Sequence, residues 1–260
     1  MAYIGGKSKC YQHIIKILND DYFNGFEYIE PFVGYAHILR RIQNKKSYIA
    51  SDNNLLLYTL LKYIQKSNDY PTITKEDYDF LKNDNTNENL INKSFAAFTY
   101  SYNGKEFGGY TNKLHNRNYP QERKTYYDNL RKNNTFMKTK IYHKSYDKIN
   151  PNGKLIYCDP PYANTTKYGK NDFDTNKFWD IIRKWSKNNY VFISEYEAPS
   201  DFIVISKKNK YSSLSGKGSN SLRIEKLFAH KSIKNTDFFK SFINKEEYDI
   251  QDNTTYVKTC

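Results

Sequence analysis

The sequence predicts an α/β protein with a doubly wound, mostly parallel sheet and one mainly helical insertion. Short apolar runs end in an acid or a proline at EYIEP, SYIASD and LIYCDPP, as buried parallel strands do. One helical stripe precedes the first run and another follows the second, and a polar, Asn-rich stretch separates them from the third. Alternation of strand and helix is the pattern of a parallel sheet with helical crossovers. A chain of 260 residues is long enough for one large domain or for one domain with a sizeable insertion.

Two helices and two strands are expected in the first 68 residues. The segment after GGKSK has apolar residues at helical spacing, namely Tyr11, Ile14, Ile15 and Leu18. A short strand, FEYIEPF, then ends at Pro31, and a second strand, SYIASD, ends at Asp52. The next helix has its stripe at Leu56, Leu57, Leu60, Leu61 and Ile64. This order begins a doubly wound sheet.

The second half resumes the alternation after the insertion. The insertion surrounds one aromatic block, FAAFTYSYNGKEFGGYT. A strand at 154–158 follows, then a helix with Phe178, Ile181, Ile182 and Trp185, then strands in NYVFISEY, DFIVISKK and SLRIEKLFAH. We therefore expect a main domain of residues 1–68 and 149–231, an insertion of residues 69–148, and a C-terminal extension of residues 232–260. The extension contains Phe238, Phe239, Phe242 and Ile243 and is either a docking helix or a disordered end.

Basic residues exceed acidic ones. The chain has 41 Lys and Arg against 28 Asp and Glu, a formal net charge of +13. Such a charge attracts a polyanion, with nucleic acid as the first candidate and an anionic membrane as the rival. Apolar runs fall well short of the roughly 20 residues that span a bilayer, and MAYIGGKSK lacks the apolar middle of a signal peptide. We expect a soluble, intracellular protein without membrane association.

The cysteines and histidines are dispersed. Cys10, Cys158 and Cys260 have no paired spacing, and the five histidines are equally scattered. This arrangement argues against a disulfide framework and against a metal site.

Two strand ends in the first half suggest a cofactor site. Gly34 lies in a turn, EPFVGYAH, directly after the first strand, where a glycine lets backbone N–H groups approach a ligand. Asp52 ends the next strand, a position at which acids accept hydrogen bonds from ribose hydroxyls. The single glycine lacks the phosphate fingerprint, so a nucleoside without pyrophosphate is favoured over NAD. The alternative is a turn glycine and a helix-capping acid, which occur in most α/β proteins.

The stretch YCDPPY suggests the chemistry. Pro160 and Pro161 cannot continue a ladder, but a strand terminator explains neither the acid before them nor the ring after them. If the carboxylate of Asp159 and the carbonyl of Pro160 each accept an N–H from an aromatic amine such as adenine N6, its lone pair is freed for attack. Tyr162 would stack on the base for roughly 1–3 kcal/mol. That gain is comparable to the few kcal/mol needed to flip a base out of a duplex.

The ordered motifs resemble those of a known family. The order YIGGKSK, EPFVG, SDNN, insertion, YCDPPY, ISEY and EKLF resembles Dam-type, alpha-class, S-adenosylmethionine-dependent DNA adenine-N6 methyltransferases. The segments SYNGKEFGGY, TTKYG and FISEYEAP are similar to the phage and prophage branch. The resemblance runs from Tyr3 to about Lys231. It implies a Rossmann-like methyltransferase fold, S-adenosylmethionine as cofactor and double-stranded DNA as substrate. It also leaves room for a cognate restriction endonuclease, and we expect a monomer or a weak dimer.

The same resemblance implies site residues. The positions that match catalytic ones are Asp159, Pro160, Pro161 and Tyr162. The positions that match cofactor-binding ones are Tyr3, Gly5, Gly6, Lys7, Glu30, Phe32, Gly34, Asp52 and Asp159. For Tyr3 and Phe32 the alternative is ordinary core packing. One departure is that Gly34-Tyr35-Ala36 stands where relatives have Gly-x-Gly. This change is mild if Ala36 has a negative φ, whereas Tyr35 adds bulk near the pocket.

The insertion is expected to read the DNA. It interleaves the basic, amide and aromatic groups needed for phosphate anchoring, base reading and stacking, namely Asn103, Lys105, Phe107, Tyr110, Lys113, Arg117 and Arg123. Lys167 and Tyr168 are expected to close over the flipped base, the alternative being a surface turn at Gly169. The sequence thus predicts a site-specific DNA adenine-N6 methyltransferase. The rivals are a methyltransferase acting on RNA or a protein amide, and a catalytically silent DNA-binding relative.

Overall fold

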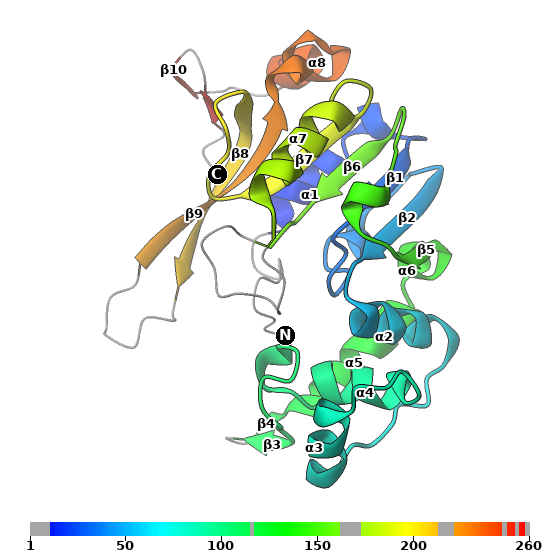
Figure 1. The fold of residues 1–260 in the computed structure, drawn as a ribbon. Helices are drawn as coiled ribbons and strands as arrows, with labels where there is room; N and C mark the ends of the chain where they lie inside the picture. The colour runs from blue at the N-terminus through cyan, green and yellow to red at the C-terminus, as the bar shows by residue number, and fades with distance from the viewer. Residues whose placement is uncertain are drawn as a thin grey trace. The chain divides into compact units, whose positions relative to one another are not determined.

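The computed structural model describes residues 11–114, 117–161, 173–212, 221–245, 249–252 and 255–257. Seven strands form one mixed sheet in the order β5-β2-β1-β6-β7-β9-β8. Their bounds are β1 Glu27–Glu30, β2 Ser47–Asp52, β5 Lys140–His143, β6 Leu155–Cys158, β7 Tyr190–Glu195, β8 Phe202–Ser212 and β9 Ser221–His230. The pairs β2–β5, β1–β6 and β6–β7 are parallel, and β9 runs antiparallel to both β7 and β8. The predicted α/β fold with a mostly parallel sheet is confirmed (Figure 1).

The chain divides into two compact units. Within the described residues, the first unit contains Val33–Arg41 and Tyr48–Tyr146. The second unit contains Cys10–Phe32, Ile42–Ser47 and Asp147–Cys260, again as far as these are described. The second unit thus joins the extension to most of the sheet, and the first joins the insertion to the turn after β1.

Buried apolar faces hold the second unit together. Helix α7 (Thr175–Trp185) begins at Asp174, whose side chain accepts the N–H of Lys177, and buries Phe178, Trp179, Ile182 and Trp185. Helix α1 (Gln12–Leu18) buries Ile14, Ile17 and Leu18. Burial of each such side chain stabilises the fold by about 1.5–3 kcal/mol. In Figure 1, α7 lies in front of β6 and β7. Both helices and the strands β1, β6, β7, β8 and β9 agree with the sequence prediction.

The C-terminal extension contains a docked helix. Helix α8 (Asp237–Lys245) follows a 3-10 turn at Lys231–Asn235. The ring of Phe238 is fully buried and lies 4.5 Å from that of Phe23, and further rings surround it at Tyr22, Tyr190, Phe192 and Phe242. The docking-helix alternative is therefore correct for residues 237–245. A small antiparallel pair follows, β10 (Asp249–Asp252) and β11 (Thr255–Val257).

The first unit is mainly helical. It contains α2 (Leu55–Lys66), α3 (Lys75–Asn83), α4 (Leu90–Phe98), α5 (Tyr119–Arg131) and α6 (Asn134–Lys138), with short 3-10 turns at Leu39–Arg41 and Tyr102–Gly104. Side chains of Asn54, Thr74, Asn118 and Asn133 cap four of these helices by accepting backbone N–H groups. Two short strands, β3 (Lys113–Leu114) and β4 (Arg117–Asn118), pair antiparallel. The mainly helical insertion is confirmed, but strand β5, which pairs with β2, was not predicted.

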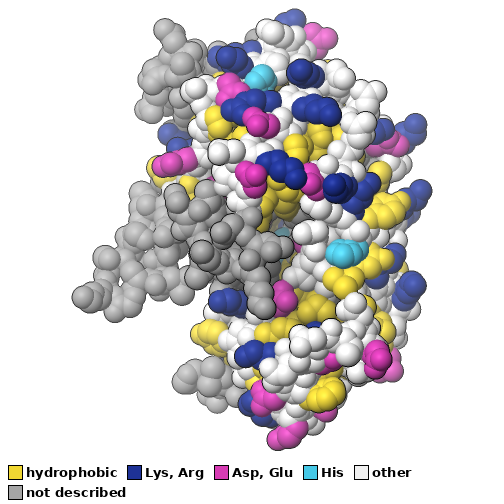
Figure 2. All heavy atoms as spheres, viewed as in Figure 1, with side chains coloured by type: hydrophobic (Ala, Val, Ile, Leu, Met, Phe, Trp, Pro, Cys, Tyr) yellow, Lys and Arg dark blue, Asp and Glu magenta, His cyan; other side chains and the backbone are white. Residues whose placement is uncertain are grey.

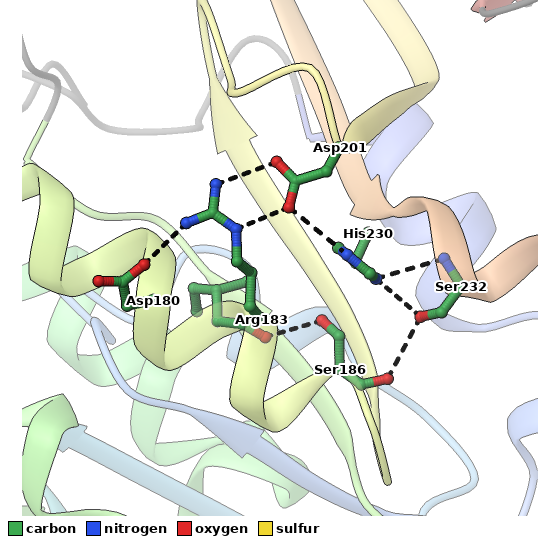
Figure 3. A network of polar contacts seen from close by, with 7 residues as sticks. Asp180, Arg183, Ser186, Asp201, His230 and Ser232 are labelled. Atoms are coloured by element: carbon green, nitrogen blue, oxygen red, sulfur yellow. Dashed lines mark hydrogen bonds and ion pairs between the residues drawn. The ribbon is translucent and has the colours of Figure 1, made fainter.

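A polar network fixes the last strands of the second unit to α7. The guanidinium of Arg183 donates to both carboxylate oxygens of Asp201, at 2.6 and 3.0 Å, and to Asp180. His230 Nε2 lies 3.5 Å from the same Asp201 carboxylate, and His230 Nδ1 contacts the hydroxyl of Ser232 (Figure 3). Arg183 thus links helix α7 to Asp201, the residue before β8.

Candidate active site

Two acids follow neighbouring parallel strands of the second unit. Strand β1 ends at Glu30, and β6 is followed at once by Asp159. The register pairs Tyr28 with Leu155, so both strands point their carboxyl ends the same way. Ligands of open α/β sheets collect beyond these ends. The second unit therefore has two carboxylates at the edge where a ligand is expected.

Glu30 is a buried carboxylate with a dedicated donor. Its side chain is only 2% exposed, and the hydroxyl of Tyr28 donates to its Oε2 at 2.7 Å. Burial raises the pKa of Tyr28 well above its ordinary value, and the Glu30 charge raises it further. Burial also raises the pKa of Cys158, with further contributions from Glu30 and Asp159. Cys158 is therefore a neutral thiol, which excludes it as a nucleophile at neutral pH.

The catalytic motif leaves the sheet directly from a fully buried strand. Leu155–Cys158 are all buried, Asp159 and Pro161 are partly exposed, and Pro160 is buried. Phe32 lies two residues beyond the end of β1. Its ring is 6.1 Å from that of Phe173 and 5.9 Å from that of Phe178. Tyr162 lies outside the described residues, as do Tyr3, Gly5, Gly6, Lys7, Lys167 and Tyr168. Their predicted roles stay predictions.

In the first unit, the turn after β1 is bonded to the end of β2. The N–H of Gly34 donates to Asp52 Oδ2 at 3.1 Å, and the N–H of Asn54 donates to Oδ1 at 2.9 Å. Gly34 has a φ of +49°, a conformation that glycine adopts without strain. Burial raises the pKa of Asp52, although these N–H groups and His143 oppose the shift. This bond places Gly34 and Asp52 next to each other, and their roles in cofactor binding stay predictions.

The departure from Gly-x-Gly has a different consequence from the expected one. Ala36 has a φ of +56°, so the condition of a negative φ is not met, and an alanine stands in a left-handed conformation that costs it energy. Tyr35 is only 2% exposed, and its ring packs edge-on against Phe98 of α4 at 5.9 Å. The bulk of Tyr35 is therefore accommodated in the core of the first unit.

The DNA-contact candidates of the insertion fall into three groups. Lys105 is exposed, Asn103 is partly exposed, and Lys113 lies on β3. Phe107 and Tyr110 pack against the ring of Tyr78, at 5.6 and 5.5 Å. The last two residues are engaged elsewhere: Arg117 forms a two-pronged ion pair with Glu122, and Arg123 is only 2% exposed.

Arg123 is enclosed by the loop that the sequence singled out. A Cβ at Gly104 would lie 2.5 Å from Arg123 Nη1, so the glycine is needed for the close approach. Gly104 has a φ of +65°, and the preceding Asn103 has a φ of +52°. Arg123 is thus a core residue of the first unit in this structure, and a DNA contact by its guanidinium would require this loop to move.

The insertion contains a cavity that the sequence did not reveal. Its volume is about 300 Å³, and its lining includes Lys75, Lys124, Tyr100, Tyr110 and Asn112 but no acidic residue. The Tyr100 and Tyr110 rings are parallel within 9°. On the face drawn in Figure 2, basic side chains are interspersed with acidic ones. Of the two cavity lysines, Lys75 is paired with Asp79, and Lys124 Nζ lies 5.9 Å from the centre of the Tyr100 ring.

A catalytic triad and a metal site are both absent from the described residues. Ser232, His230 and Asp201 resemble a hydrolase triad, but Asp201 is paired with Arg183, and His230 Nδ1 caps the turn of Lys231–Asn235 by accepting the N–H of Ser232. Within the described ranges, His, Cys, Asp and Glu side chains do not gather in any group of three that would hold a metal ion. In the same ranges, no helix is both long and apolar enough to cross a bilayer.

Three side chains had no predicted role: Tyr28 beside Glu30 on β1, and Lys75 and Lys124 in the cavity of the insertion. Tyr28 is two residues before Glu30 on one strand, so the two share a face. This period-2 signal was available in EYIE. Lys75 and Lys124 lie 49 positions apart, and the sequence gives no sign that they line one cavity.

The mostly parallel sheet with acids at its strand ends defines an α/β fold of the kind that binds ligands beyond the carboxyl ends of its strands. The model of the D12 class N6 adenine-specific DNA methyltransferases matches residues 3–237, and the chain belongs to this family. It is therefore an adenine-specific DNA methyltransferase, with DNA as its substrate.

The other comparisons are more distant. None of the curated proteins matches the chain. Among solved structures, a conserved hypothetical protein from Streptococcus pyogenes is 11% identical over 85% of this chain and 96% of its own, with a TM-score of 0.37. The rRNA methyltransferase AviRa from Streptomyces viridochromogenes is 10% identical over 89% of this chain and 84% of its own, with a TM-score of 0.38.

Proposed function

We propose that the protein is a Dam-type, alpha-class enzyme that transfers a methyl group from S-adenosylmethionine to N6 of an adenine flipped out of duplex DNA. The observation that carries this proposal is the pair of acids at the ends of β1 and β6, with Asp159 followed by two prolines. Membership of the adenine-specific family supports the choice of substrate. The segment FISEYEAP supports the phage and prophage branch.

The cofactor roles follow from the chemistry of each side chain. Asp52 would accept hydrogen bonds from the ribose hydroxyls, since its two oxygens have acceptor capacity beyond the backbone N–H groups of Gly34, Asn53 and Asn54. Glu30 would pair with the methionine ammonium group, because a buried carboxylate gains most from a cation. Phe32 offers an apolar ring, and Gly34 permits close approach. Tyr3, Gly5, Gly6 and Lys7 are proposed from the resemblance alone.

In the transfer step, the N6 lone pair attacks the methyl carbon of the sulfonium. The carbon–sulfur bond breaks with its electron pair going to sulfur, which leaves S-adenosylhomocysteine. The amino group is cationic after the transfer and then loses a proton. Asp159 and the Pro160 carbonyl would each accept one hydrogen bond from an N6–H group, which localises the lone pair on N6 before the attack. Asp159 need not be a strong base, because proton loss follows the transfer.

DNA binding is proposed for the insertion. Lys105 is exposed for phosphate contact, and Lys75 and Lys124 line the cavity beside two tyrosines. Arg117 would exchange Glu122 for a phosphate, as a surface ion pair is worth only about 0–1 kcal/mol. Lys167 and Tyr168 would close over the flipped base. We expect a monomer or a weak dimer, and a cognate restriction endonuclease would be the partner if the enzyme serves a restriction–modification system.

Two rival functions make different predictions. A methyltransferase of RNA or a protein amide would use the same hydrogen-bonding device on another planar amine. A catalytically silent relative would bind DNA without the cofactor, and the strained turn at Ala36 is the feature in its favour. Calorimetry with S-adenosylmethionine separates the silent relative from both enzymes.

The test uses methyl-labelled S-adenosylmethionine and mixed-sequence duplex DNA, with digestion of the product to nucleosides. With the wild type we expect label in N6-methyl-2′-deoxyadenosine. With Asp159→Ala the labelling rate should fall at least about a hundredfold. Asp174→Ala is the matched control, because it also removes one carboxylate, from an exposed residue that caps helix α7. Equal labelling by Asp159→Ala and the wild type would overturn the catalytic role.

A further inference from the structure

Helix α5 of the insertion contacts the backbone of the turn between Val33 and Arg41. The hydroxyl of Tyr126 donates to the carbonyl of Tyr35 at 2.6 Å, and both residues are buried. The guanidinium of Arg40 lies 5.2 Å from the centre of the Tyr126 ring. Asn133 Nδ2, beyond the end of α5, donates to the carbonyl of Arg40 at 2.8 Å. The turn therefore rests on the insertion at two points.

The peptide that Tyr126 holds is next to the strained residue. The carbonyl of Tyr35 and the N–H of Ala36 belong to one peptide group, and that N–H donates to the carbonyl of Val33 at 2.8 Å. One residue earlier, the N–H of Gly34 donates to Asp52. With Ala36 at a φ of +56°, this conformation requires bonds on both sides to persist. Tyr126 supplies one at the Tyr35 carbonyl, and Asp52 supplies one at the Gly34 N–H.

His37 completes the contact from the turn. Its Nδ1 lies 3.3 Å from the Tyr126 hydroxyl oxygen. Burial lowers the pKa of His37 to about 3, with Arg40 and Arg41 contributing, so the ring is neutral. Because the single hydroxyl hydrogen of Tyr126 goes to the Tyr35 carbonyl, Nδ1–H of His37 is the donor to that oxygen. The Tyr126 hydroxyl thus joins two residues of the turn.

We propose that Tyr126 is a positioning residue for cofactor binding: its hydroxyl holds Gly34, Tyr35 and Ala36 in the conformation that presents Asp52 to the nucleoside. This inference rests on the proposed function and deepens it, because it makes cofactor affinity depend on a side chain of the DNA-recognition insertion. Apparent affinity scales with the fraction of molecules whose turn is already in the binding conformation. Loss of the hydroxyl lowers that fraction without removing any group that touches the cofactor.

The adjacent tyrosine provides a matched control. Tyr127 is also on α5 and fully buried, but its hydroxyl pairs with Thr99 Oγ1 at 2.9 Å, inside the insertion. Tyr126→Phe and Tyr127→Phe each remove one buried hydroxyl and keep the ring. Both variants are compared with the wild type by calorimetry with S-adenosylhomocysteine, by the KM for S-adenosylmethionine against kcat, and by thermal unfolding without ligand.

We expect Tyr126→Phe to bind S-adenosylhomocysteine about tenfold more weakly, which corresponds to about 1.4 kcal/mol. The KM for the cofactor should rise to match, with kcat within about twofold, while Tyr127→Phe leaves both at wild-type values. If both variants bind as the wild type does, or if Tyr127→Phe loses as much affinity as Tyr126→Phe, the positioning role is wrong. If the wild type itself binds neither S-adenosylmethionine nor S-adenosylhomocysteine, it is the proposed function that fails.

Discussion

Replacement of Tyr28 by Phe tests whether Glu30 is held as a charged, site-forming carboxylate. The Tyr28 hydroxyl donates to Glu30 at 2.7 Å, and the Tyr28 ring is fully buried. A hydrogen bond to a charged group contributes about 1.5–3 kcal/mol, and a phenylalanine keeps the ring packing. We expect Tyr28→Phe to lower the free energy of unfolding by about 2 kcal/mol. At about 2–4 °C per kcal/mol for a domain of this size, the melting temperature should fall by about 4–8 °C.

Tyr157→Phe is the control for this change. Tyr157 is fully buried on the neighbouring strand β6, and its hydroxyl pairs with the uncharged Ser194 Oγ at 2.8 Å. A neutral pair contributes about 0.5–1.5 kcal/mol, so the loss should be about half as large. Urea unfolding followed by circular dichroism measures both losses on the same scale.

A second assay separates stability from the site. A saturating cofactor at 100 times its Kd stabilises the wild type by about 2.7 kcal/mol. Because Tyr28 orients the carboxylate proposed for the methionine ammonium group, Tyr28→Phe should lose part of this stabilisation, and Tyr157→Phe should keep it. Equal losses of stability in the two variants, together with unchanged cofactor stabilisation, would refute the assignment of Glu30.

Three further outcomes are expected. Phe238→Ala should cost about 3–5 kcal/mol in urea unfolding because its ring fills the core under α8, whereas Phe80→Ala, at a ring that is 67% exposed, should change little; similar values would show that α8 is not docked. Ala36→Gly should raise the free energy of unfolding by about 0.5–1 kcal/mol. Glycine removes the strain of a left-handed alanine, and the larger entropy that glycine loses on folding cancels only part of this gain. A lower free energy of unfolding in the same assay would contradict the positive φ. The pKa of His37 is about 3 in the folded protein against 6.5 in the unfolded chain. Below pH 6.5 the unfolded state therefore takes up a proton that the folded state does not, and the free energy of unfolding decreases as the pH is lowered. His37→Gln should flatten this slope between pH 6.5 and 4 in pH-dependent unfolding, and an unchanged slope would show that His37 is not the group responsible.

The sequence predicted strand β6, which is fully buried, and missed strand β5, which is mostly exposed. The four residues of β6 are all buried, and such runs stand out as continuous apolar segments. Strand β5 has one buried residue, Ile141, among four, so KIYH does not differ from a polar loop. Its place at the sheet edge is decided by pairing with β2, which local sequence does not encode.

The positions of Glu30, Asp52 and Asp159 at strand ends were predictable from the sequence, and their roles in the site stay predictions. The side-chain directions of Tyr35 and Arg123 were not predictable, because each depends on a partner far along the chain, Phe98 for one and Gly104 for the other. Their residue types suggested a pocket wall and a phosphate contact, whereas both are core residues of the first unit. Tertiary packing, rather than residue type, decides these positions.

The most direct test of the central claim is single-molecule sequencing of DNA from cells that express the wild type, with cells that express Asp159→Ala as the reference. The method reports the modified base and its context together. We expect N6-methyladenine at one short recurrent sequence with the wild type and none above background with Asp159→Ala. DNA without N6-methyladenine, from cells in which the folded wild-type protein is present, would contradict the assignment as a DNA adenine-N6 methyltransferase.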